Sequence, residues 1–231
     1  MTKIAIIPAR GGSKRIPKKN IKLFLGKPII AYAIETAINS NLFDEIIVST
    51  DSSEIAEIAK KHGASVPFLR SKKNASDFAT TFDVLEEVFR WWNEHKTTLA
   101  TYACCIYPTA PFVSSNLLNA AFTKLVDNSF DSVFPVIKYG FPIQRSLKVV
   151  NEQGKMRLFQ PEYLNSRSQD LENAYHDSGQ FYFFNIESVL EQKKLWTNNT
   201  GVIEINELDA QDIDTKTDWK LAEIKYKLRN E

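Results

Sequence analysis

The sequence predicts a three-layer α/β fold built on a mostly parallel sheet. Short apolar runs that suit buried strands alternate with longer segments whose apolar residues recur at helical spacing. Such alternation is typical of βαβ units, in which helices cover both faces of a parallel sheet. The length of 231 residues and the 43% hydrophobic content are ordinary for one globular α/β domain.

The first 136 residues give the clearest alternation. Helices are predicted where apolar positions repeat every three or four residues. The second of them begins at Ser53, a suitable N-cap, and ends at His62-Gly63, where glycine permits a left-handed residue. The predicted strands are residues 3–8, 45–49, 65–69, 101–107 and 132–136, and the predicted helices are 28–40, 53–62, 84–92 and 117–125.

The pattern changes over residues 138–175. Residues 146–150 and 155–159 suit two strands around a turn, and an irregular polar stretch follows. This segment has too few apolar residues for its own core, so we interpret it as an insertion in a single domain, residues 1–231. Regular structure resumes with a strand at 180–184, a short helix, a strand at 201–205 and a closing helix at 217–228.

Composition excludes several classes of protein. A formal net charge of +1 argues against general nucleic-acid binding, and no apolar run is long enough to span a membrane. The apolar stretch near the N-terminus stops at Pro8, too early for a signal-peptide core, so we expect a cytoplasmic protein. The neighbours Cys104 and Cys105 lie in an apolar run and are expected to be buried, reduced thiols.

The charges are distributed unevenly along the chain. Residues 1–34 carry eight Lys or Arg and no acid, whereas residues 204–218 carry six Asp or Glu and only Lys216 as a base. A basic cluster and an acidic cluster together suit a site that holds both polyphosphate and metal.

The basic cluster includes a glycine-containing loop, PARGGSKRIPKKN at residues 8–20, directly after the first strand. Ligands of open α/β sheets bind at the carboxyl ends of strands. Gly11 and Gly12 allow the backbone to approach an anion, and Arg10, Lys14 and Lys19 can neutralise three linked phosphates. The spacing is neither a P-loop nor a dinucleotide fingerprint, and a solvated basic loop is the alternative interpretation.

The acidic cluster includes Asp212 and Asp214, two residues apart. In extended backbone both carboxylates face the same way, and Mg²⁺ favours one or two carboxylates together with phosphate oxygens and water. The alternative is that Asp214 or Thr215 is simply the N-cap of the last helix, with Asp218 in its first turn.

Taken together, these motifs resemble the CMP-sialic acid synthetases, the acylneuraminate cytidylyltransferases. The resemblance continues at residues 43–51, 69–70, 75–77, 108–111 and 212–219, in the family's order. It implies a sheet of nucleotide-diphospho-sugar transferase type, CTP as substrate, Mg²⁺ as cofactor and pyrophosphate as product. It also assigns the metal to Asp212 and Asp214, and places Asn20, Arg70 and Thr81 near the cytidine.

We therefore predict catalytic roles for Arg10, Lys14, Asp212 and Asp214. The predicted CTP-binding residues are Ala9, Arg10, Gly11, Gly12, Ser13, Lys14, Lys19, Asn20, Arg70 and Thr81. No general base is assigned.

The substrate end departs from the sialic acid pattern. The run YHDSGQFY at residues 175–182 replaces an arginine-proline-asparagine-glycine motif, and Tyr107 replaces a glutamine. Both departures are similar to the pseudaminic acid branch of the family, which implies a role in bacterial surface glycan or flagellin glycosylation. The predicted sugar-binding residues are Tyr107, Arg145, Arg167, His176, Asp177, Ser178 and Gln180.

Several alternatives remain open from sequence. The same reaction could act on sialic, legionaminic or Kdo-type acids, another nucleotide could replace CTP, or the basic loop could belong to a phosphate-binding protein. His176 could be a packed or capping histidine. The family resemblance also implies a homodimer formed by residues 138–175, in which Arg145 and Arg167 reach the neighbouring protomer's substrate.

Overall fold

The computed structural model describes residues 1–230 and is built around a seven-stranded sheet. The strand order is β11-β6-β10-β5-β1-β4, and β9 also pairs with β6. β1 is parallel to β4 and β5, and β6 is parallel to β11, whereas β10 is antiparallel to both β5 and β6 and β9 is antiparallel to β6. The predicted mostly parallel α/β sheet is confirmed, with β9 and β10 running against the other strands.

Most predicted elements are confirmed to within a few residues. The strands are β1 (Thr2–Pro8), β4 (Glu45–Ser49), β5 (Ala100–Ile106), β6 (Ser132–Lys138), β9 (Tyr175–Asp177), β10 (Phe181–Asn185) and β11 (Thr200–Ile205). The helices are α1 (Ile29–Asn39), α2 (Ser53–Lys61), α3 (Thr81–His95), α4 (Ser115–Asp127), α5 (Ile186–Gln192) and α6 (Lys216–Asn230). None of these helices is long and apolar enough to cross a membrane.

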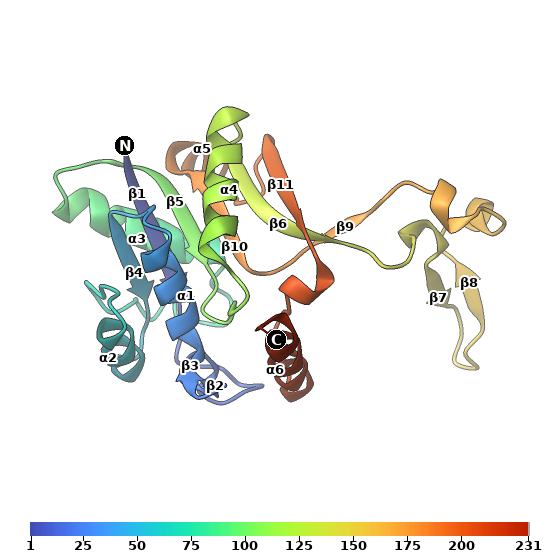
Figure 1. Ribbon diagram of the computed structural model, residues 1–231, viewed down its shortest axis with the longest axis horizontal. Coiled ribbons are helices and arrows are strands. Elements are labelled where there is room, and N and C mark those ends of the chain that lie inside the picture. Colours follow the sequence, from blue (N-terminus) through green and yellow to red (C-terminus); the bar gives the residue numbers. More distant parts are fainter. Residues whose placement is uncertain (231) are drawn as a thin grey trace.

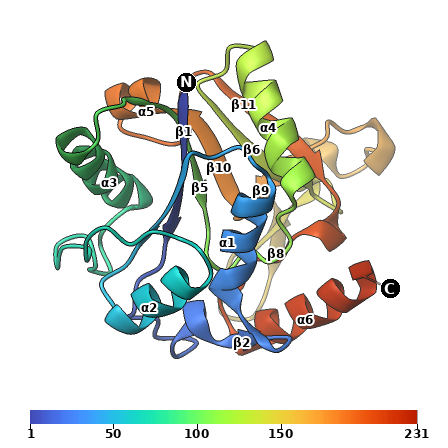
Figure 2. The ribbon, with the colours of Figure 1, turned by 60° about the vertical axis from the view of Figure 1, so that its left-hand side comes forward.

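Helices cover both faces of the sheet (Figure 2). Because side chains alternate along a strand, Ala5 and Ile7 of β1 pack with α1, α2 and α4, while Ile4 and Ile6 pack with α3 and α5. The two cysteines of β5 divide in the same way and are fully buried free thiols, as the sequence predicts.

A third apolar cluster lies under α6, beside α1 and the hairpin of β2 (Leu23–Phe24) and β3 (Lys27–Pro28) (Figure 1). It buries Ile16 of the basic loop together with Ile213, the residue between the two predicted metal aspartates. These two side chains are almost completely removed from solvent, at 1% and 0% exposure. The cluster therefore fixes the basic loop, residues 8–20, and the acidic segment, residues 209–214, to each other.

Two local predictions are wrong. Residues 65–69 do not form a continuous strand, because only the bridges Ile47 to Ser65 and Thr50 to Leu69 form. Pro67 lies between them and has no N–H to donate to a ladder. The helix α2 is capped by Ser52 rather than Ser53, since the Ser52 hydroxyl accepts a hydrogen bond from the Ile55 amide at 3.4 Å.

Residues 139–174 form an arm that leaves the sheet after β6 and returns in β9 (Figure 1). The arm holds the predicted strand pair, which the structure confirms as β7 (Leu147–Val149) and β8 (Met156–Leu158). The end of the arm corrects a prediction. Tyr175–Asp177 forms a strand, whereas the sequence indicated irregular structure up to residue 180. Three residues are too few for a visible alternation pattern, and the partner strand is separated from them by the whole arm.

Candidate active site

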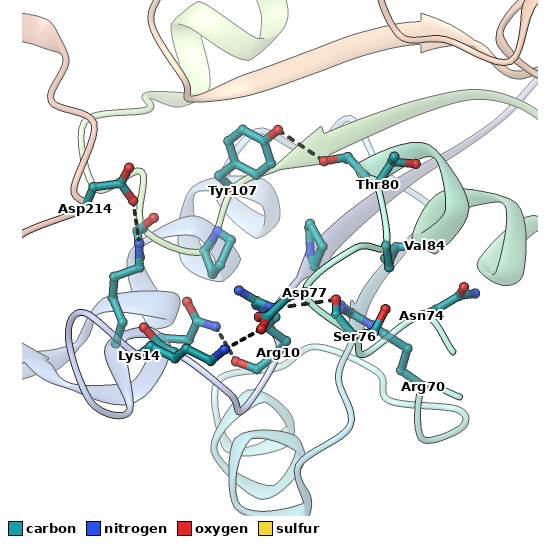
Figure 3. Close-up of a pocket in the computed structure, with 18 of the residues that line it drawn as sticks. Arg10, Lys14, Arg70, Asn74, Ser76, Asp77, Thr80, Val84, Tyr107 and Asp214 are labelled. Atoms are coloured by element: carbon teal, nitrogen blue, oxygen red, sulfur yellow. Dashed lines mark hydrogen bonds and ion pairs between the residues drawn. The ribbon is translucent and has the colours of Figure 1, made fainter. Parts of the chain in front are cut away.

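One cavity of about 550 Å³ opens at the carboxyl ends of β1 and β5 (Figure 3). Its walls come from the loop after β1, the stretch leading into α3, the residues after β5, and the segment before α6. It brings together many of the sequence-predicted residues, namely Arg10, Ser13, Lys14, Lys19, Asn20, Arg70, Thr81, Tyr107, Asp212 and Asp214.

The backbone of the basic loop is anchored by contacts within the protein. The buried Ala9 donates its amide to the Ser49 carbonyl at 2.9 Å, and the Asn20 side chain donates to the Arg10 carbonyl at 2.9 Å. Gly11 donates its amide to Asp51 at 2.8 Å and lies so close to the next loop that an added Cβ would be 3.2 Å from the Cβ of Ser52. Ala9 and Gly11 lie outside the cavity lining and act as anchors.

Gly12 differs from its neighbour. Among the described residues, no atom lies within 4 Å of the position that a Cβ at Gly12 would occupy, and the residue is outside the lining of the cavity. Its backbone is therefore open to solvent rather than closed by packing.

Two of the three predicted phosphate-binding cations, Arg10 and Lys14, are paired with Asp77 (Figure 3). Arg10 Nη1 lies 2.6 Å from Asp77 Oδ1, and Lys14 Nζ lies 2.5 Å from Asp77 Oδ2. The hydrogen bonds from Lys14 and Arg10 hold the pKa of Asp77 below its usual value. One carboxylate thus bridges two of the cations that are predicted to bind the polyphosphate.

A second group of cations surrounds the acidic segment. Arg15 Nη2 and Lys19 Nζ lie 2.9 Å and 3.4 Å from Asp214 Oδ1, and Lys19 also donates to the Ile213 carbonyl at 2.6 Å. Lys19 therefore connects the basic loop to the acidic segment directly. Arg15 was not among the predicted site residues, although it belongs to the same basic loop as Arg10, Lys14 and Lys19.

Asp212 and Asp214 line the cavity, and the residue that caps the start of α6 is Thr215. The Thr215 hydroxyl accepts from the Asp218 amide at 3.2 Å, and the Asp218 carboxylate accepts from the Thr215 amide at 2.6 Å. This capping box begins α6 without Asp212 or Asp214 as the cap. It also accounts for Asp218 as a residue of the first turn.

The donor set of this pair fits a divalent cation. Burial, followed by the neighbouring Asp214 carboxylate, raises the pKa of Asp212, and Asp212 has no ion-pair partner within residues 1–230. Asp212, without an ion pair, and Asp214, paired with Arg15 and Lys19, lie on one cavity wall. Such a carboxylate pair matches the preference of Mg²⁺ for carboxylates completed by phosphate and water. Residues 1–230 contain no group of three or more His, Cys, Asp or Glu side chains that could hold a metal ion, so further ligands would come from substrate and solvent.

The opposite wall holds Arg70, Thr81 and Tyr107. Arg70 is 6% exposed and donates through Nε to the Ser49 hydroxyl at 3.0 Å and through Nη2 to the Ser49 carbonyl. The Thr81 and Tyr107 hydroxyls lie 3.3 Å apart. Burial raises the pKa of Tyr107 to about 12, so its hydroxyl remains a hydrogen-bond donor at neutral pH.

Apart from Tyr107, the predicted sugar-binding residues lie outside this cavity. The His176 ring packs against Tyr139 with centroids 4.9 Å apart, and Asp177 accepts from the Gly179 amide at 2.8 Å and from the Tyr182 hydroxyl. The other members are the buried Ser178 and Gln180 and, on the arm, Arg145 and Arg167, which bond to Ser168 and Asp170.

Several cavity residues have no counterpart among the sequence-predicted site residues. They are Pro8, Arg15, Asn74, Ser76, Asp77, Ala79, Thr80, Val84, Pro108 and Thr109. Six of them carried a signal, because residues 8–20, 75–77 and 108–111 belong to motifs of the resemblance. Thr80 was also detectable, since it forms a capping box with Asp83 at the start of α3.

Comparison with known proteins decides the family. Residues 4–200 match the family model described as cytidylyltransferase. The chain belongs to the cytidylyltransferase family. It is therefore a nucleotidyltransferase, although the acidic pair lies beyond the matched residues.

Relatives match this cytidylyltransferase over its whole length. A Campylobacter jejuni protein named pseudaminic acid cytidylyltransferase is 41% identical, covering 100% of this chain and 99% of that protein. A Legionella pneumophila protein named CMP-N,N'-diacetyllegionaminic acid synthase is 34% identical, covering 99% and 97%. A solved CMP:2-keto-3-deoxy-manno-octonic acid synthetase in complex with CTP has a TM-score of 0.69 at 16% identity, covering 100% and 99%, and shares the fold.

Proposed function

We propose that this cytidylyltransferase joins CTP to pseudaminic acid, a nine-carbon acidic sugar, and releases CMP-pseudaminic acid and pyrophosphate. The full-length similarity to a protein named for that reaction supports the substrate. The observation that carries the proposal is that Arg10, Lys14 and Lys19 share one cavity with Asp212 and Asp214. A cationic wall suits the triphosphate, and an acidic wall suits its metal.

The reaction forms one bond and breaks one bond at the α-phosphorus. The oxygen of the anomeric hydroxyl bonds to the α-phosphorus and its proton passes to solvent, while the bond from this phosphorus to the bridging oxygen of the β-phosphate breaks, so pyrophosphate leaves with the electron pair. Arg10 and Lys14 would exchange Asp77 for phosphate oxygens and stabilise the charge on the departing pyrophosphate. Lys19 would add a third positive charge while holding the acidic segment in place.

Asp212 and Asp214 would hold Mg²⁺, which would neutralise phosphate charge and lower the pKa of the attacking hydroxyl. The chain's own part is to keep these carboxylates facing the cavity. Lys19 and Arg15 orient Asp214, and burial of Ile213 fixes the backbone between the two carboxylates. Binding the two substrates in this arrangement supplies proximity and orientation.

A pyrophosphate-release assay tests the proposal. Four nucleoside triphosphates are each supplied with Mg²⁺ and pseudaminic, sialic, legionaminic or Kdo-type acid. We expect CTP with pseudaminic acid to give the fastest release. A competition between pseudaminic and sialic acid then quantifies each CMP-sugar, and equal rates of formation would contradict the proposed sugar preference while leaving cytidylyl transfer intact.

We also propose that the protein acts as a cytoplasmic homodimer, with the arm as the contact. The arm exposes large apolar side chains that a monomer would leave in water, namely Phe141, Ile143, Leu147, Val149 and Phe159. A partner would cover them and could receive Arg145 and Arg167 near its sugar. A protein that is monomeric by light scattering and fully active in the pyrophosphate-release assay would contradict this arrangement.

A further inference from the structure

The turn between β9 and β10 is closed by one carboxylate. Asp177 Oδ1 accepts from the Gly179 amide at 2.8 Å, and Asp177 Oδ2 accepts from the Tyr182 hydroxyl. Gly179 has φ of +65°, a left-handed conformation that glycine adopts without strain. Both carboxylate oxygens are therefore engaged by donors of the same chain.

This turn, residues 177–180, touches the acidic segment, residues 209–214, at two points. The Gln180 side chain donates to the Asp209 carbonyl at 2.6 Å. A Cβ added to Gly179 would lie 3.7 Å from Cγ of Asp212, so the bare backbone of the turn faces that side chain closely. The Gln180 carbonyl also accepts from the Tyr107 amide at 2.9 Å, which joins the turn to the opposite wall of the cavity.

The acidic segment needs such support because it follows the short 3₁₀ helix Glu207–Asp209, and residues 210–214 belong to no strand or helix that could fix them. Apart from the turn, Lys19 donates to the Ile213 carbonyl at 2.6 Å and Lys225 to the Ala210 carbonyl at 3.0 Å. Arg15 and Arg229 form ion pairs with Asp214 and Asp209. None of these bonds is made by the Asp212 carboxylate, which lies beside the bare backbone of Gly179.

We propose that Asp177 is a positioning residue for Asp212, acting through the 177–180 turn, and not a ligand of the sugar. Its two hydrogen bonds set the conformation at Gly179, and that backbone limits where the Asp212 carboxylate can lie. This inference rests on the proposed metal role of Asp212. It assigns to metal binding a motif whose sequence suggested recognition of the sugar.

Metal binding tests the assignment separately from catalysis. Mn²⁺ alone is titrated into the purified protein, and free Mn²⁺ is measured by electron paramagnetic resonance. We expect Asp177→Asn and Tyr182→Phe each to weaken Mn²⁺ binding about 10-fold and to change the KM for the sugar less than about 3-fold, as for partners that orient a metal ligand. Asp44→Asn is the matched control. The Asp44 carboxylate accepts a hydrogen bond only from the Lys3 amide, at 2.8 Å, and Asp44 lies just before the first residue of β4, at the end of the strand away from the cavity.

The outcomes separate a positioning role of Asp177 from a role as a ligand of the sugar. Wild-type Mn²⁺ affinity in both variants, a raised sugar KM alone, or no Mn²⁺ binding by the wild type would each overturn the assignment. Tyr182→Phe keeps every atom except one hydroxyl, so the test stands even where Asp177→Asn does not fold. Wild-type protein that binds Mn²⁺ but forms no CMP-sugar would refute the proposed function, while the Mn²⁺ titration of the variants would still decide the role of Asp177.

Discussion

Replacing Lys19 with methionine tests the link between the basic loop and the acidic segment. Methionine keeps most of the length of the side chain and removes the ammonium group. The change leaves the Ile213 carbonyl without its donor at 2.6 Å and removes one of the two ion pairs of Asp214, that at 3.4 Å, while Arg15 remains at 2.9 Å. The Lys19 side chain is only 19% exposed, so water replaces these contacts poorly.

The magnitude follows from the two contacts. A hydrogen bond from a charged donor contributes about 1.5–3 kcal/mol. The ion pair adds less than about 1 kcal/mol, because Asp214 is 39% exposed and solvent screens it. We therefore expect the free energy of unfolding to fall by about 2–3 kcal/mol. Turnover should also fall, since the acidic segment loses one of its anchors.

Urea unfolding followed by tryptophan fluorescence measures the loss, with a similar urea dependence expected for both proteins. Lys18→Met is the matched control. Lys18 pairs with Glu54 at 2.8 Å, but both side chains are more than half exposed, at 66% and 52%. The control should cost less than about 1 kcal/mol. Equal losses in the two variants would refute the reasoning, because they would show that the Lys19 contacts contribute no more than an exposed pair.

Three further predictions address the site and the core. Lys14→Ala should lower kcat/KM by the equivalent of about 2–4 kcal/mol, the scale of one preorganised electrostatic donor, whereas a solvated lysine would leave it unchanged. Asp212→Asn should reduce kcat far more than CTP affinity, and near-normal turnover at saturating Mg²⁺ would contradict the metal role. Iodoacetamide at pH 8 should modify Cys104 and Cys105 only after unfolding, because burial raises both thiol pKa values, that of Cys105 to about 12, and the thiolate is the reactive form. Rapid labelling of the native protein would show that β5 is less well buried than the structure indicates.

Local sequence pattern was sufficient for most of the fold. The apolar run of β1, the helical spacing of α1 and the turn between β7 and β8 are encoded within a few neighbouring residues. The failures have different causes. The stretch 65–69 is apolar enough for a strand but has Pro67, and the strand Tyr175–Asp177 depends on β6, which lies beyond the arm.

The sequence by itself determined the chemistry available to this protein, namely a loop rich in cations, a pair of carboxylates and a sugar-end motif that departs from the sialic acid pattern. Only the tertiary structure decided which charges meet. Lys14 pairs with Asp77 across 63 residues, and Lys19 pairs with Asp214 across 195. The physical reason is that spacing along a chain reports only local conformation, whereas ion pairs and hydrogen bonds of this kind form where packing of the sheet, α6 and the shared apolar cluster brings distant segments together.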